Sequence, residues 1–213
     1  MSSDARTGPA TDQAPPPEPA PAGRSAKRPR PIFLLIGVAL AVALGIGLFS
    51  SFGGSSKSGR PGPGDAVPHF SLPKLVGSGT VRVTADGGSN GKAAILLFFA
   101  SWCAPCQGEI PALAATVRNQ PAAVADRVAT IGIDGSDPPA AAMSFVHSAG
   151  VTFPVGVDAT FQVTSGLFYF TGLPEAVAVE ANGTIKAIHY GALSTAEFEA
   201  WQRALATSAT SPG

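Results

Sequence analysis

The pattern of apolar and polar positions divides the chain into a polar start, one long apolar run and a region of shorter elements. The run Ala93–Phe99 contains no polar residue, which is typical of a strand buried on both faces. Further segments of strand length lie at 127–134, 151–157, 175–180 and 184–190. The residues between them predict helices at 107–117, at about 138–148, at 159–169 and from Ser194 onward.

Local signals mark where some of these elements begin or turn. Asp137-Pro138 is the pattern of an N-cap followed by proline at the first helical position. Asn182-Gly183 predicts a two-residue hairpin turn between the last two strands. Ser194 and Glu197 have the spacing of a capping box at the start of the last helix. Short apolar segments within 66–83 predict a peripheral hairpin.

This order of elements predicts an α/β fold. Strands joined by helices imply a sheet with a parallel centre and helices on both of its faces. The hairpin near the C-terminus then adds an antiparallel edge, so we expect a central mixed sheet.

The long apolar run, at residues 32–49, indicates that the chain has a membrane-spanning segment before its globular part. Residues 1–31 are rich in proline, alanine and charge, and predict a disordered tail. Residues 32–49 carry no charge, and as a helix they would span about 27 Å, close to the thickness of a bilayer core. Four basic residues within 24–30 precede the run. The positive-inside rule therefore predicts a transmembrane anchor at 32–52, with the N-terminus cytoplasmic and the rest exported.

A cleavable signal peptide is the alternative to this anchor. Its apolar region would span only about 7–15 residues and end at an Ala-x-Ala-like site, which Ser50-Ser51-Phe52 matches poorly. Residues 53–64 are rich in Gly, Ser and Pro and predict a linker, while 208–213 predict a flexible tail.

The formal net charge is zero, but it is unevenly distributed. Residues 1–64 carry a net charge of +4, so the remainder carries −4. A mildly acidic exported part argues against nucleic acid as a partner.

Both cysteines of the chain, Cys103 and Cys106, stand two residues apart directly after the buried strand and before a helix. This position places the first sulfur at a helix N-terminus, where the helix dipole stabilises the thiolate that performs disulfide exchange. The second sulfur is close enough to resolve a mixed disulfide. A purely structural disulfide would close too short a loop to stabilise much, and zinc would need two further ligands. The spacing therefore predicts a thiol–disulfide oxidoreductase.

The run Trp102-Cys103-Ala104-Pro105-Cys106 followed by Glu109-Ile110-Pro111, together with Gly172-Leu173-Pro174 before a strand, resembles the thioredoxin fold. More narrowly, residues 64–205 are similar to the membrane-anchored extracytoplasmic thioredoxins of the TlpA/ResA/DsbE (redoxin) family. The resemblance implies a thioredoxin-like domain at 65–207, with Cys103 as the attacking thiol and Cys106 as the resolving one. It also implies that Pro174 is a cis-proline facing the disulfide. The substrate-binding residues it implies are Trp102, Pro105, Leu173, Pro174 and Glu175.

Two positions depart from thioredoxin itself. Leu97 occupies the place of a buried aspartate on the central strand, so the proton acceptor for Cys106 must come from elsewhere. Glu109 lies three residues after Cys106, on the same helical face, and matches an acidic position of the ResA-like members. We therefore predict that Glu109 is the general base of the resolving step. Glu175, after the proline, resembles the cytochrome c maturation branch.

The resulting hypothesis is a membrane-tethered reductant that needs no cofactor and no metal, only the Cys103–Cys106 couple. Expected partners are exported proteins with thiols or disulfides, apocytochrome c among them, and a membrane electron donor. A disulfide-forming oxidant and a cytochrome c maturation thioredoxin are alternatives within this class. A copper chaperone is the alternative from another class, with His189 as its candidate distant ligand, although that function prefers Cys-x-x-x-Cys.

Overall fold

The structure is a computed structural model that describes residues 59–84 and 89–208, all within one compact unit, 58–213. The predicted tail 1–31, the predicted anchor 32–52, the first half of the predicted linker (53–58) and residues 209–213 lie outside the described residues. Of the helices in the two described stretches, none combines the length and the apolar character needed to cross a bilayer.

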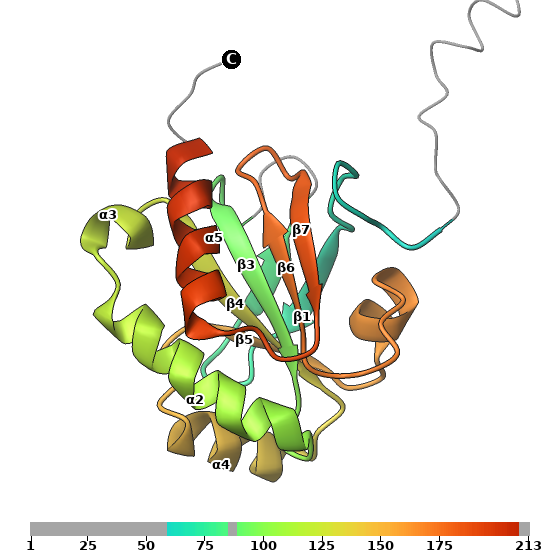
Figure 1. The fold of residues 1–213 in the computed structure, drawn as a ribbon. Helices are drawn as coiled ribbons and strands as arrows, with labels where there is room; N and C mark the ends of the chain where they lie inside the picture. The colour runs from blue at the N-terminus through green and yellow to red at the C-terminus, as the bar shows by residue number, and fades with distance from the viewer. Residues whose placement is uncertain (1–58, 85–88, 209–213) are drawn as a thin grey trace, which may run out of the picture. The chain divides into compact units, whose positions relative to one another are not determined.

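A five-stranded mixed sheet forms the centre of the domain, in the order β5-β4-β3-β6-β7 (Figure 1). β3 (Ala93–Phe99) is the middle strand, and all seven of its residues are buried, as its apolar run predicts. β4 (Val128–Gly135) and β5 (Val155–Asp158) continue the sheet in parallel on one side. β6 (Glu175–Val179) and β7 (Ile185–Tyr190) are antiparallel on the other side. The predicted mixed sheet with an antiparallel edge is confirmed.

The longer helices all pack on one face of this sheet (Figure 1). They are α2 (Ala104–Asn119), α4 (Pro139–Ser148) and α5 (Thr195–Ser208), with the single turn α3 (Ala122–Ala125) after α2. The shared core joins Leu97 of β3 to Leu113, Val146 and Phe198 of the three helices. The strand order progresses from β3 to β4 to β5 in one direction, so right-handed crossovers place α2 and α4 on the same side.

Helices lie on both faces of the sheet, as predicted, but the helix described on the second face is short. The other face is covered by the hairpin β1 (Phe70–Pro73) and β2 (Thr80–Val83), and by residues around the short π-helix η1 (Gln162–Leu167). The helix predicted at 159–169 is shortened to η1. After it, Phe168 and Phe170 pack against Phe98, with ring centroids 5.0 Å apart in both pairs.

The turn between β6 and β7 also differs from its prediction. The Glu180 N–H donates to the Thr184 carbonyl at 2.8 Å, which leaves three residues in the loop instead of two. A type I′ turn needs positive φ at both central residues, whereas here only Gly183 has it, at 82°. The capping box at the start of α5 is confirmed, because the Glu197 N–H donates to the Ser194 hydroxyl oxygen and the Glu197 carboxylate accepts from the Ser194 N–H.

Candidate active site

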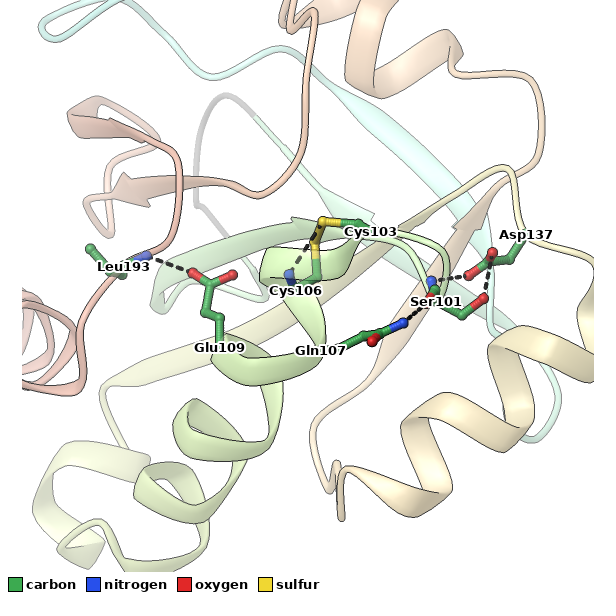
Figure 2. Close-up of a disulfide and its surroundings, with 7 residues drawn as sticks. All are labelled: Ser101, Cys103, Cys106, Gln107, Glu109, Asp137 and Leu193. Atoms are coloured by element: carbon green, nitrogen blue, oxygen red, sulfur yellow. Dashed lines mark hydrogen bonds between the residues drawn. A yellow bond between two sulfur atoms is a disulfide. The ribbon is translucent and has the colours of Figure 1, made fainter.

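The two cysteines form a disulfide at the start of α2 (Figure 2). Cys103 is the N-cap residue, and its sulfur accepts the Cys106 N–H at 3.3 Å. Pro105 stands in the first turn, where the missing N–H of a proline costs no helical hydrogen bond. The sequence expectation that the first sulfur lies at a helix N-terminus agrees with this geometry. The dipole of α2 and its free N–H groups favour a thiolate on Cys103 over a thiolate on Cys106.

Access to the two sulfurs is unequal. Cys106 is completely buried, whereas Cys103 retains 5% of its surface at the edge of the turn. The neighbouring Trp102 is 58% exposed. Cys103 is therefore the more accessible of the two sulfurs, which is compatible with its predicted role as the attacking thiol.

Glu109 is buried one turn beyond Cys106 and contacts the loop before α5. Its Oε1 accepts the Leu193 N–H at 2.8 Å, as Figure 2 shows. Its Oε2 has no hydrogen-bond partner among the described residues. Burial raises the pKa of Glu109 to about 7, against the opposing effect of the Leu193 hydrogen bond. A carboxyl group with such a pKa exchanges protons near neutral pH, as a general base must.

The predicted substrate-binding loop precedes β6. The Leu173–Pro174 peptide bond is cis, as the resemblance implies. Leu173 is half-buried, and the next residue, Glu175, is buried with its Oε2 unpartnered in the described part of the chain. Burial raises the pKa of Glu175 to about 7, and the positive charge of Arg60 opposes that rise.

Arg60 lies within the predicted linker 53–64, and the structure places it beside the site. Its guanidinium donates to the Tyr169 carbonyl and, at 3.5 Å, to the Tyr190 hydroxyl. It also lies 5.4 Å from the centre of the Tyr190 ring. The end of the predicted linker is thus attached to the domain beside Glu175, and nothing in its local composition marks it as different from the rest of the linker.

Asp137 has a different role from the predicted one. The N-cap of α4 is Pro138, and no side chain of the described residues caps that helix. The Asp137 carboxylate instead accepts the Ser101 N–H at 2.6 Å and the Ser101 hydroxyl at 2.8 Å. On the other side of the same turn, the Gln107 amide donates to the Ser101 carbonyl at 2.9 Å. The turn that carries Trp102 and Cys103 is therefore held from both sides (Figure 2).

A cavity of about 290 Å³ opens beside the turn. Two of the predicted substrate-binding residues, Trp102 and Leu173, line it. Aromatic rings of Phe161 and Phe170 also line it, with the hydroxyl-bearing residues of η1. The size and the mixed lining suit a single side chain of a bound polypeptide better than a large cofactor. Pro105, in the first turn of α2, is exposed and is not among the residues that line this cavity.

No metal centre is evident in residues 59–84 and 89–208, where no group of three or more His, Cys, Asp or Glu could hold an ion. His189, the candidate copper ligand, has its Nε2 3.2 Å from the Ala192 carbonyl oxygen. The redox centre is the Cys103–Cys106 disulfide, and the expectation that no cofactor is needed stays a prediction.

Comparisons with known proteins agree with this site. Residues 63–188 match the model of the AhpC/TSA family. The thiol-disulfide oxidoreductase ResA of Oceanobacillus iheyensis is 30% identical over 141 residues, covering 65% of this chain and 70% of ResA. The thioredoxin-like protein YneN of Bacillus subtilis is 27% identical over 144 residues, covering 64% and 76% of the two chains. A thiol:disulfide interchange protein DsbE structure from Chlorobium tepidum, 24% identical, matches the fold with a TM-score of 0.58 over 69% of this chain and 99% of its own.

Proposed function

We propose that the chain, a thiol-disulfide oxidoreductase that belongs to the AhpC/TSA family, acts as a membrane-tethered reductant of exported proteins. The observation that carries the proposal is the arrangement around the disulfide. Cys103 lies at a helix N-terminus, Cys106 is buried behind it, and the buried carboxyl group of Glu109 follows one turn later. Like the roles of the individual residues, the direction of the reaction and the tether are part of the proposal.

The exchange reaction uses the two sulfurs in turn. The Cys103 thiolate attacks one sulfur of a client disulfide, so a mixed disulfide forms and the other client sulfur leaves as a thiolate. Cys106 then loses its proton and attacks Cys103, which releases the second client sulfur and forms the Cys103–Cys106 disulfide seen here. Two electrons pass to the client, and a membrane electron donor must return two to the couple.

Two buried carboxyl groups, Glu109 and Glu175, support the proposed direction. Strong oxidants of this fold owe their potential to a stabilised thiolate in the reduced form. The helix N-terminus stabilises that thiolate, but the buried carboxyl groups of Glu109 and Glu175, partly ionised at neutral pH, oppose it by like-charge repulsion. Destabilising the reduced, ionised form favours donation of electrons to clients.

The reduction potential tests this direction. We expect the full-length protein to have a potential nearer to −270 mV than to −120 mV, the rough limits known for this fold. Replacing both carboxyl groups, in Glu109→Gln/Glu175→Gln, should raise the potential by about 30 mV or more, because the thiolate is then less disfavoured. Equilibration with glutathione redox buffers measures both values, and exposed Asp126→Asn is the matched control. A wild-type potential near −120 mV would identify an oxidant instead.

The tether and the exported location rest on the sequence before the described domain. Residues 32–49 are uncharged, the basic cluster within 24–30 precedes them, and 53–64 form a short predicted linker. Exported clients with paired thiols are then the substrates within reach, and apocytochrome c is a client of this kind. Glu175 after the cis-proline supports the cytochrome c maturation branch only through the family resemblance.

Labelling of intact cells tests the tether. After mild reduction, a membrane-impermeant thiol reagent should modify the protein in intact cells, because Cys103 then lies outside the cytoplasm and is the more accessible thiol. The labelled protein should stay in the membrane fraction after a carbonate wash. A Cys103→Ser/Cys106→Ser variant gives the background. Labelling that requires cell lysis, or a soluble form cut near Ser51, would contradict the tether.

A further inference from the structure

A buried carboxyl group that the exchange reaction does not use lies behind the active-site turn. Asp134, near the end of β4, is completely buried. Neither of its carboxyl oxygens has a hydrogen-bond partner in the part of the chain that the structure describes. A buried polar group without a partner costs stability, and an ionised one costs far more, so its presence requires an explanation.

The register of the sheet places this group close to the redox site. Asp134 pairs with Phe99, the last residue of β3 before the turn that leads to Cys103. Side chains of paired residues in a parallel sheet point to the same face, and the Phe99 side chain belongs to the core beneath α2 and α4. Asp134 therefore points into the layer between the sheet and the helix that carries both cysteines.

Two other carboxyl groups, those of Asp137 and Asp158, interact electrostatically with Asp134, and both accept hydrogen bonds from other residues. Asp158, at the end of β5, accepts the backbone N–H groups of Val163 and Thr164 and the Thr164 hydroxyl. Asp137 accepts the N–H and the hydroxyl of Ser101. Asp158 and Asp137 thus each accept several hydrogen bonds, whereas neither carboxyl oxygen of Asp134 has a hydrogen bond of normal geometry among the described residues.

Complete burial without such hydrogen bonds favours the neutral, protonated form of Asp134. Burial, then the Asp137 side chain and, with a smaller effect, Asp158 raise its pKa to about 8, against the opposing effect of the Asp137 backbone N–H. A neutral carboxyl group can donate a hydrogen bond to a nearby carboxylate, whereas an ionised one repels it.

We propose that Asp134 holds a proton at neutral pH and, through the Asp137 carboxylate, positions the Ser101 turn that presents Trp102 and Cys103. Asp134 is a positioning residue, since it acts through Asp137 and Ser101 and does not touch the reacting sulfurs. Loss of its proton creates a second negative charge against Asp137, which weakens the acceptor that holds Ser101. The proposal rests on the exchange reaction above but is independent of its direction.

The burial of Asp134 also sets how the stability of the fold depends on pH. In the unfolded chain Asp134 ionises near pH 4, whereas in the fold it stays protonated up to about pH 8. Folding therefore binds a proton between these values, so stability falls as the pH rises from about 4 to about 8. The positioning of Ser101 is lost only above about pH 8, when Asp134 ionises within the fold.

A direct test follows the carboxyl carbon of Asp134 by NMR in the oxidised, full-length protein, labelled at aspartate and held in detergent micelles. Neither cysteine titrates in this state. We expect one aspartate carboxyl to titrate between about pH 7 and pH 9, to be absent from Asp134→Asn, and to persist in Asp126→Asn. If every aspartate titrates below about pH 6, the proposal is wrong.

A second test compares the rates of disulfide exchange of Asp134→Asn and wild type. Asparagine keeps the shape and hydrogen-bond donor of the protonated acid, so the ratio of the two rates should be near 1 at pH 6–7. The ratio should rise at least about threefold by pH 9.5, because only the wild type gains a charge there. Asp134→Ala lacks the donor and should be slow at every pH, with Asp134→Asn restoring the neutral rate.

A rate ratio that stays constant from pH 6 to pH 9.5 would overturn the positioning role. Failure of the proposed direction of transfer would appear differently, as a high reduction potential with the NMR titration and the rate ratio unchanged. The two proposals can therefore fail separately.

Discussion

Cys106→Ser will accumulate mixed disulfides with client proteins, and Cys103→Ser will not. Cys103 is the sulfur at the start of α2 with residual exposure, and Cys106 is completely buried. A client therefore bonds to Cys103, and without Cys106 nothing in the couple resolves that bond. Both variants should lose multiple turnover entirely, which is the largest effect expected for any single substitution in this chain. Non-reducing electrophoresis followed by reduction of the trapped species measures the difference.

The double variant Cys103→Ser/Cys106→Ser is the control, since it keeps the size of both side chains and has no thiol. Thermal unfolding of all three variants under reducing conditions should agree within a few degrees, which separates loss of chemistry from loss of fold. Equal trapping by the two single variants would show that the structure does not assign the attacking and resolving sulfurs correctly.

Glu109→Gln will slow the release of the mixed disulfide while leaving the first attack nearly unchanged. If Glu109 takes the proton of Cys106, its loss should lower the rate of resolution by about 10²-fold or more, the usual range for base catalysis. The structure makes glutamine the right replacement, because its carbonyl oxygen can still accept the Leu193 N–H. Stopped-flow measurement of the two steps, with a model client disulfide, distinguishes them.

The pH dependence of this step has a definite sign. Burial raises the pKa of Glu109 from 4.5 to about 7, so the ionised base is populated only as the pH rises through about 7. The resolving rate of the wild type should increase through that range, and the increase attributable to Glu109 should vanish in Glu109→Gln. If Glu109→Gln resolves the mixed disulfide at the wild-type rate from pH 6 to pH 8, Cys106 loses its proton to water and not to Glu109.

Glu109→Ala separates the chemical role from the structural one. It removes the acceptor of the buried Leu193 N–H as well as the base, and an unpaired buried donor costs about 1–3 kcal/mol. We expect this variant to be less stable than Glu109→Gln by roughly that amount but equally slow in resolution. If Glu109→Ala loses stability but Glu109→Gln resolves the mixed disulfide at the wild-type rate, the role of Glu109 is structural only.

Features that depend on neighbours within a few positions can be predicted from the amino-acid sequence alone. The apolar run 93–99 can only be buried on both faces, which identified the central strand with its observed bounds. Two cysteines at the junction of a strand and a helix fixed the chemistry, because a helix N-terminus stabilises a thiolate wherever it occurs. The capping box at Ser194 is equally local, since its hydrogen bonds join residues three positions apart.

The distant side chains that surround the disulfide, in contrast, are set by contacts between elements far apart in the chain. Asp137 reaches Ser101 across 36 positions and Glu109 reaches Leu193 across 84, so neither contact leaves a periodic trace in the chain. The sequence placed Asp137 at a helix N-cap because that use of aspartate is local and common, and the sheet register instead brought it to the active-site turn. The burial of Asp134 has the same origin, because hydrogen bonds between strands, and not the residues beside it, set which groups it meets.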